Sequence, residues 1–146
     1  QRIKEEYILV DGYNVIYTWE NLKALAKENI DSARDALIDI LSDYSAMKGT
    51  KLIAVFDAYR LRNHKEECIE YHNINVVYTK SAQTADYYIE RFAKENKNKY
   101  RIRVVTSDNI EQVIVSSDNA FITSSREFYD EVKNVKEEFN KRHGIT

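Results

Sequence analysis

The chain has 146 residues, with 22 lysines and arginines against 24 aspartates and glutamates, for a formal charge of −2. A chain of this length suits one domain, able to bury roughly 70% of the surface that it exposes when unfolded. The near balance of charge excludes a general positive field for nucleic acid, so any such binding is local. We therefore expect a single domain over residues 1–146.

Cysteine and glycine usage exclude further classes of protein. The single cysteine, Cys68, can form no internal disulfide, and no apolar run approaches the roughly 18 residues of a membrane span. Both features favour a cytoplasmic protein without a membrane partner. Only three glycines occur, all far apart, whereas a dinucleotide-binding fingerprint or a Walker phosphate loop needs clustered glycines.

The first half of the chain predicts a buried strand, two helices and a second buried strand. These elements are expected over residues 7–10, 21–29, 32–48 and 51–56. The longer helix has suitable ends, because Asp31 can cap its start and Gly49 suits its end. Both strands stop at a carboxylate, the first at Asp11 and the second at Asp57.

The second half continues the alternation of strands and helices. It predicts a strand, a helix, a strand and a short strand over residues 74–79, 84–96, 101–107 and 119–124. Thr84 can cap the helix, and the strand over 101–107 again ends at an acid, Asp108. Ser124 and Glu127 have the spacing of a capping box, which predicts that a last helix begins there.

This alternation predicts an α/β fold with a mainly parallel central sheet, flanked by helices on both faces. Parallel neighbours need right-handed crossovers, so the strand ends point one way. In open sheets of this kind the ligand crevice lies outside the carboxyl ends of the strands. We therefore expect Asp11, Asp57 and Asp108 to lie at that edge.

A fourth acid, Asp86, falls in the first turn of the helix predicted over 84–96, on the same edge. Taken alone, it is explained by a favourable interaction with the helix dipole. Four converging carboxylates, however, repel one another unless a cation lies between them, and hard divalent cations prefer oxygen ligands. The set therefore predicts a metal site. Glu90, one helical turn beyond Asp86, is either a fifth acid or a solvated side chain.

Four separated motifs, in this order, resemble a known family. "DGYN" at residue 11, "VFDA" at 55, "TADYYIE" at 84 and "VVTSDNIEQ" at 104 are similar to the NYN domains, which are PIN-like metal-dependent ribonucleases, and most closely to their YacP-like branch. The resemblance runs over nearly the whole chain. It departs from the family pattern at residues 116–123, whose contacts it therefore leaves open.

The resemblance implies a PIN-like, Rossmann-like domain and an endoribonuclease that hydrolyses RNA phosphodiester bonds. The implied catalytic acids are Asp11, Asp57, Asp86 and Asp108. The resemblance implies that this set holds Mg²⁺ or Mn²⁺. Because such a topology usually places the ends of the first and fourth strands side by side, we expect Asp11 and Asp108 to be the central ligands, with Asp86 opposite and Asp57 farther out, acting through water. Asn14, which matches the position that braces the first acid, and Ser107 are implied to support them.

Contacts with RNA are expected close to the acids. Tyr13 and Tyr59 are candidates to stack on bases. Arg60, Arg62 and Lys65, directly after Asp57, are placed to hold a phosphate backbone. His64, in the same polar loop, is interpreted as solvated or RNA-facing rather than as a catalytic base.

A second basic segment, between residues 91 and 103, leads away from the acids. Its Lys94, Lys97 and Lys99 are expected to bind a partner rather than the substrate, with a solvated helix end as the alternative. The low net charge leaves few phosphate contacts, which predicts weak binding of free RNA and a need for a larger assembly. The family resemblance points to messenger RNA on the ribosome.

Two other functions compete with the nuclease. A non-catalytic RNA-binding or adaptor domain keeps the fold, although the intact acids argue against it. A receiver-like phosphoacceptor domain would use Asp57, but such chemistry needs paired acids after the first strand and a lysine after the last, and this chain lacks both. Trp19 and Cys68 are expected in the core.

Overall fold

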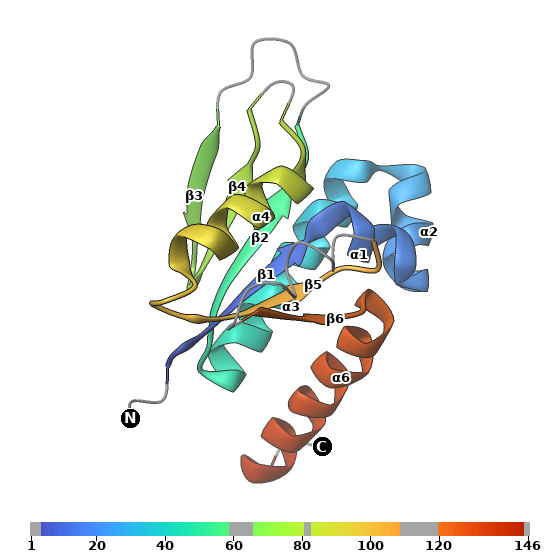
Figure 1. The fold of residues 1–146 in the computed structure, drawn as a ribbon. Helices are drawn as coiled ribbons and strands as arrows, with labels where there is room; N and C mark the ends of the chain where they lie inside the picture. Colours follow the sequence, from blue (N-terminus) through green and yellow to red (C-terminus); the bar gives the residue numbers. More distant parts are fainter. Residues whose placement is uncertain (1–3, 59–65, 81–82, 109–119, 145–146) are drawn as a thin grey trace.

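A computed structural model describes residues 4–58, 66–80, 83–108 and 120–144. It shows the expected α/β fold, a six-stranded sheet with helices on both faces (Figure 1). Within the described residues no helix is long and apolar enough to cross a membrane.

The sheet is parallel except at one edge. Its strands in chain order are β1 (Glu6–Asp11), β2 (Lys51–Phe56), β3 (Glu67–Tyr71), β4 (Ile74–Tyr78), β5 (Arg101–Val105) and β6 (Ala120–Thr123). Their spatial order is β3-β4-β2-β1-β5-β6, and only the β3–β4 pair is antiparallel. The carboxyl ends of β1, β2 and β5 therefore meet at one edge, as predicted.

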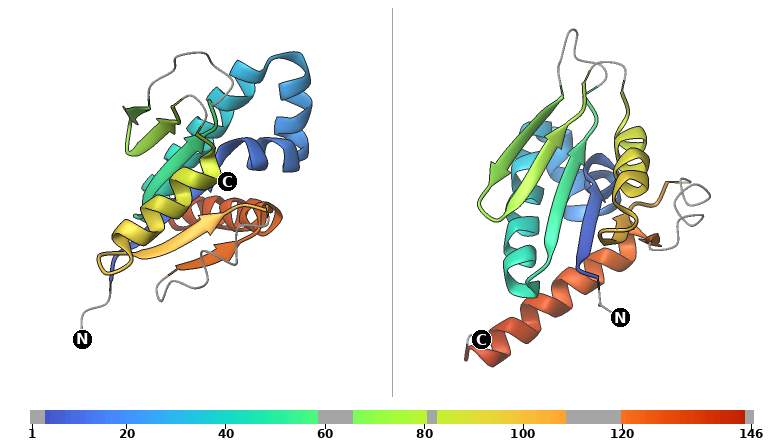
Figure 2. Two further views of the ribbon diagram at one scale, coloured as in Figure 1. Left: turned by 45° about the horizontal axis from the view of Figure 1, so that its top comes forward. Right: turned by 60° about the vertical axis from the view of Figure 1, so that its left-hand side comes forward.

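The helices are divided unequally between the two faces. They are α1 (Gly12–Thr18), α2 (Glu20–Glu28), α3 (Ile30–Lys48), α4 (Ala85–Asn96) and α6 (Ser125–Arg142). Helix α4 covers one face, and α1, α2, α3 and the beginning of α6 cover the other (Figure 2). Alternate residues of β1 belong to the two apolar cores, one on each face of the sheet, because successive side chains of a strand point to opposite faces. Ile8 and Val10 pack with α1 and α3, while Leu9 packs with α4.

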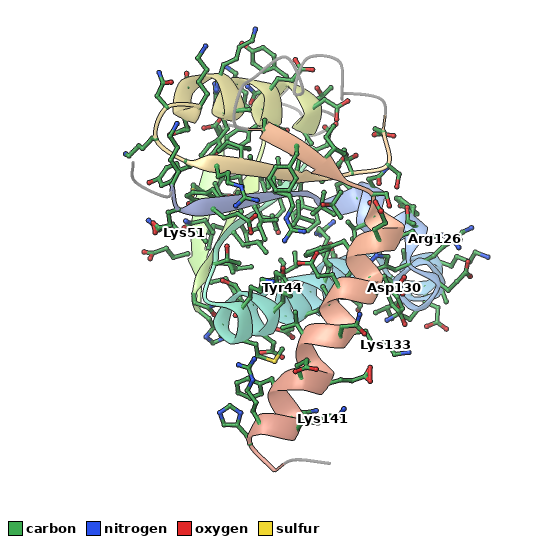
Figure 3. The ribbon with its side chains drawn as sticks, turned by 60° about the horizontal axis from the view of Figure 1, so that its bottom comes forward. Tyr44, Lys51, Arg126, Asp130, Lys133 and Lys141 are labelled. Atoms are coloured by element: carbon green, nitrogen blue, oxygen red, sulfur yellow. The ribbon has the colours of Figure 1, made fainter. Side chains whose placement is uncertain are left out.

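Helix α6 is fastened to the sheet by a buried ion pair. Its Glu131 accepts two hydrogen bonds from the Arg103 guanidinium of β5, at 2.6 and 2.8 Å, and one from the hydroxyl of Tyr44 on α3. Figure 3 shows α6 running past α3 near the labelled Tyr44. At the start of α6, Ser124 and Glu127 form the predicted capping box. This bracing fixes the amino end of α6 beside the carboxyl edge of the sheet.

Two expectations about the local structure were wrong, and two were confirmed. Helix α3 begins at Ile30, and its cap is Asn29, whose side chain accepts from two backbone N–H groups, rather than Asp31. Gly49 ends it in the left-handed conformation, as expected. Cys68 is exposed, because it lies on the edge strand β3 and not in the core. Trp19 is buried, as predicted.

Helix α1 and strand β3 were not predicted. The sequence of α1, "GYNVIYT", is short and rich in poor helix formers, so its helix depends on packing Val15 and Ile16 under the sheet. Strand β3 is almost wholly exposed and pairs only with β4, so it lacks the apolar pattern of a buried strand.

Candidate metal centre and nucleic-acid cleft

Three aspartates converge at the carboxyl edge of the sheet. Asp11 closes β1, Asp86 lies in the first turn of α4, and Asp108 follows β5. Each offers a carboxylate oxygen, and these oxygens all lie within 4.8 Å of one another. Asp57, which follows β2, lines the same cleft but does not belong to this close group.

The sheet register explains this convergence. Strand β1 lies between β2 and β5, with Asp11 beside Val55 and Val10 beside Val105. The turn after β5 therefore begins next to Asp11, and Asp108 in this turn lies close to it. Asp86 arrives from α4 on the other face, where Thr84 caps the helix by accepting from the Tyr87 N–H, as predicted.

Asp11 is held in an environment that disfavours its charge. It is 6% exposed, and its pKa is raised from 3.8 to about 7, chiefly by burial and further by the carboxylates of Asp86 and Asp108. A hydrogen bond from the hydroxyl of Thr106, at 2.9 Å, and one from the backbone of Asn14 oppose this rise. An ionised Asp11 is therefore stabilised most by a cation placed among the three acids.

The pKa of Asp86 is also raised. Burial is the first cause, followed by repulsion from Asp108, Glu90 and Asp57. Among the described residues that line this cleft, Arg34 is the one basic side chain. Within the described part of the cleft, Arg34 is therefore the one cation that can offset repulsion within the acidic group.

The donor set fits a hard divalent cation. It consists of carboxylate oxygens, which Mg²⁺ and Mn²⁺ favour. Two oxygens bound to one Mg²⁺ lie at most about 4.2 Å apart, and the three aspartates already bring theirs within 4.8 Å. Small side-chain adjustments would bring all three onto one ion.

A hydrogen-bond network holds the turn after β5. The hydroxyl of Thr106 donates to Asp11 and accepts from the N–H of Asp108 at 3.0 Å, so it joins two of the acids. The side-chain oxygen of Asn14 accepts from the Ser107 N–H at 2.8 Å and from the Ser125 hydroxyl at 2.6 Å. The predicted supporting residues Asn14 and Ser107 thus lie together and tie α1, the β5 turn and α6.

Thr106 and Ser125 were missed by reasoning from the sequence. Thr106 lies two residues before Asp108, and a hydroxyl at that spacing can reach the N–H of the acid, as an ST-turn does. That signal was available. Nothing local identifies Ser125, because its partner Asn14 is 111 residues away.

Gly12 is required beside the first acid. A Cβ atom at this position would lie 2.4 Å from the Phe56 ring of β2. Only glycine lets α1 begin directly after Asp11 while Phe56 packs against the turn. The "DG" pair therefore fixes where the chain leaves β1.

The acids form one side of an open cleft of about 880 Å³. Tyr13, which was predicted to contact RNA, lines it, together with Tyr17, Arg34 and Tyr78. Four other predicted RNA-binding or loop residues, Tyr59, Arg60, Arg62 and His64, lie outside the described residues, as do Lys65 and residues 116–119. Residues 120–123 form β6, which pairs with β5.

The residues predicted to bind a partner lie at the opposite end of the sheet. Lys94 is in the last turn of α4, and Lys97 and Lys99 follow it, just before β5 begins. The ammonium group of Lys99 lies 5.4 Å from the centre of the Tyr100 ring. The separation from the acids agrees with the sequence-based placement.

A mainly parallel sheet with an acidic group at its carboxyl edge defines a PIN-like α/β domain. The YacP-like NYN domain model matches residues 8–145, and the chain belongs to this family. The chain is 35% identical to the YacP protein of Bacillus subtilis (strain 168) over 138 residues, which are 94% of this chain and 81% of that protein.

Solved structures agree with this assignment. A crystal structure of Rae1 (YacP) from Bacillus subtilis, a tryptophan-to-leucine mutant, matches with a TM-score of 0.80 at 34% identity, over 94% of this chain and 80% of that one. A second crystal structure of Rae1 (YacP) matches with a TM-score of 0.76 at 34% identity, over 93% and 78% of the two chains. The predicted family and fold are therefore confirmed.

Proposed function

We propose that this protein is a divalent-metal-dependent endoribonuclease that hydrolyses RNA phosphodiester bonds. The observation that carries the proposal is the close approach of Asp11, Asp86 and Asp108 in an open cleft without a neutralising lysine among its described residues. Membership of the YacP-like NYN family, related to PIN-like nucleases, supports the same reaction.

Each acid has a distinct role in this proposal. Asp11, Asp86 and Asp108 hold Mg²⁺ or Mn²⁺, and Thr106 keeps Asp11 and Asp108 in register through its hydroxyl. When bound, such an ion lowers the pKa of water and neutralises charge on the reacting phosphate. Asp57 lies on the same cleft outside the close group, so it orients water rather than binding the ion directly. The products are a 3′-hydroxyl and a 5′-phosphate.

The substrate is messenger RNA engaged with the ribosome in the cytoplasm. The net charge is −2 and the described part of the cleft has a single basic side chain, so few phosphates are neutralised. Since much of non-specific RNA affinity comes from counterion release at phosphates, free RNA binds weakly. The basic surface around Lys97 and Lys99 supplies a contact with ribosomal RNA away from the cleft.

The reaction is tested with a 5′-labelled RNA in Mg²⁺, in Mn²⁺ and in EDTA. Cleavage with either metal, none in EDTA, and none by the folded Asp86→Asn protein are expected. Cleavage that persists in EDTA contradicts the proposed chemistry. Metal-independent RNA binding without any cleavage by the wild-type protein favours the non-catalytic RNA-binding domain instead.

The ribosome is tested separately, by comparing cleavage of one messenger RNA naked and during translation at equal Mg²⁺ and salt. Faster cleavage during translation is expected. Equal rates in the two settings would show that the ribosome does not present the substrate, while leaving the nuclease activity itself intact.

A further inference from the structure

Part of the lining of the cleft consists of aromatic rings around one arginine. Arg34 of α3 donates to the hydroxyl of Tyr13 at 2.9 Å and pairs with Asp31, and it lies close enough to Tyr78 to lower the pKa of that hydroxyl against the larger rise caused by burial. The rings of Tyr13 and Tyr78 pack on Phe56 with centroid separations of 5.2 and 5.6 Å. Residues of α1, β4 and α3 thus hold the guanidinium in a fixed place on the cleft wall.

Arg34 is suited to bind a phosphate. Its side chain keeps 22% of its surface exposed, and it is the one basic residue among the described residues of the cleft, beside five acids. A guanidinium carries five N–H donors in a planar fork that matches phosphate geometry. The pair with Asp31 competes only weakly with a phosphate, because that carboxylate is 71% exposed and exposed ion pairs contribute little energy.

Tyr17 provides a different kind of contact on the same wall. It is the tyrosine of the second turn of α1, one turn after Tyr13, and it is 56% exposed although its ring is large and apolar. A ring in this position offers a face on which a nucleobase can stack. In duplex RNA the bases stack on one another, so only an unpaired nucleotide can use such a face.

We propose that Arg34 and Tyr17 form a subsite beside the acidic centre, which binds one unpaired nucleotide of the RNA. Arg34 binds the phosphate next to the scissile one, and Tyr17 stacks on the base of that nucleotide. Tyr13 and Tyr78 hold the guanidinium in position. This assignment rests on the proposed nuclease function, and it adds two residues that bind the nucleotide next to the scissile phosphate.

The test measures binding rather than cleavage. The Asp86→Asn protein in Mg²⁺ is titrated into a fluorescent oligouridine, and into the same strand paired with oligoadenine, with fluorescence anisotropy as the readout. The single strand is expected to bind more tightly than the duplex. Equal affinity for the two forms would overturn the proposal.

Arg34→Gln should weaken binding to the single strand. It should also reduce the slope of log affinity against log salt by about 0.7, the contribution of one phosphate contact in a single strand. Arg34→Lys should keep the slope, because it keeps the charge. Arg142→Gln, near the exposed end of α6, is the matched control and should change neither quantity.

Tyr17→Ala should weaken binding by about tenfold, the loss of one stacked base, without changing the salt slope. Tyr17→Phe should bind like the parent, since the ring is kept. Tyr129→Ala, an exposed tyrosine of α6 outside the cleft, is the control. If Arg34→Gln lowers the melting temperature, Arg34→Lys and the Tyr17 pair still decide the matter.

The outcomes separate this inference from the proposed function. Unchanged affinity and salt slope in Arg34→Gln, together with metal-dependent cleavage by the wild-type protein, would overturn the subsite and keep the nuclease. Reduced binding by the Arg34 and Tyr17 variants, without cleavage of either free or translated RNA by the wild-type protein, would keep the subsite as an RNA-binding site and refute the enzyme.

Discussion

The two ends of the central sheet both carry clustered charges, acidic at the carboxyl end and mixed at the amino end, where Lys51 lies 3.6 Å from Glu5. At the carboxyl end, the oxygens of Asp11, Asp86 and Asp108 approach within 4.8 Å, and Asp11 is buried. At the amino end, Lys51 and Lys99 lie 5.5 and 5.4 Å from the centre of the Tyr100 ring and remain exposed.

The contrast follows from the different exposure of the charged groups to solvent. Exposed charges are screened by water and salt, and the lysines have favourable partners in the Tyr100 ring and, for Lys51, in Glu5. A buried carboxylate has no such screening, so its pKa rises until a cation compensates it. The amino end is therefore a stable charged surface as it stands, whereas the carboxyl end is arranged for an ion.

The largest effect should come from removing a ligand at the carboxyl end. Asp11→Asn should lower the rate of RNA cleavage by at least about a thousandfold, because the metal supplies several kcal/mol of stabilisation to the transition state. Asp130→Asn, on α6 and labelled in Figure 3, is a matched control that should cleave normally. Full cleavage by the folded Asp11→Asn protein would refute the metal assignment.

In the absence of metal, Asp11→Asn should raise the stability of the folded protein, although it lowers the rate of cleavage. The pKa of Asp11 is about 7 in the folded chain and ordinarily 3.8, so the unfolded state loses its proton first as pH rises. Below pH 3.8 Asp11 is protonated in both the folded and the unfolded state, so no folding stability is lost. Between 3.8 and 7 folding stability declines, and above 7 the loss is complete, at most about 4 kcal/mol.

Urea unfolding in EDTA measures this decline. Asp11→Asn, which has no proton to lose, should be more stable than the wild-type protein above pH 7, and the difference should vanish towards pH 3.8. Saturating Mg²⁺ should reverse the order, since it binds the folded wild-type protein. A variant that is less stable in EDTA at every pH would show that the carboxylate is compensated by the protein itself.

A smaller loss is expected at Asp57, which lies outside the close group. Asp57→Asn should lower cleavage by about ten- to hundredfold, as for residues that act on a metal through other ligands, and should keep more activity than Asp11→Asn at saturating Mn²⁺. Initial rates over a Mn²⁺ titration measure this. Equal losses in the two variants would place Asp57 among the direct ligands.

The smallest effect is expected at the amino end. Charge reversal of Lys97 and Lys99 to glutamate should lower only the translation-dependent cleavage, by roughly tenfold for two lost phosphate contacts. The same change at Lys133 and Lys141 of α6, labelled in Figure 3, is the control. A matching loss on naked RNA would mean that the amino end affects the cleft and is not a separate docking surface.

The sequence by itself determined the parallel strands, the family and the acids. Two of the predicted parallel strands are short apolar runs followed directly by an aspartate, and the strand predicted over 101–107 also ends at one. Short apolar runs of this kind are typical of strands buried in a sheet. Parallel order then brings the aspartates to one edge, because crossovers leave strand ends pointing one way. Thr84 and the Ser124–Glu127 box were predictable for the same reason, since a cap is made within one turn of helix.

Only the tertiary structure decided the rest. Helix α1 forms because Val15 and Ile16 find a place under the sheet, and its own sequence is too short to hold a helix. The bond between Asn14 and Ser125 and the bond between Arg34 and Tyr13 join residues 111 and 21 positions apart. No local pattern encodes such contacts, because they depend on how close the completed packing of the sheet and helices brings the two side chains.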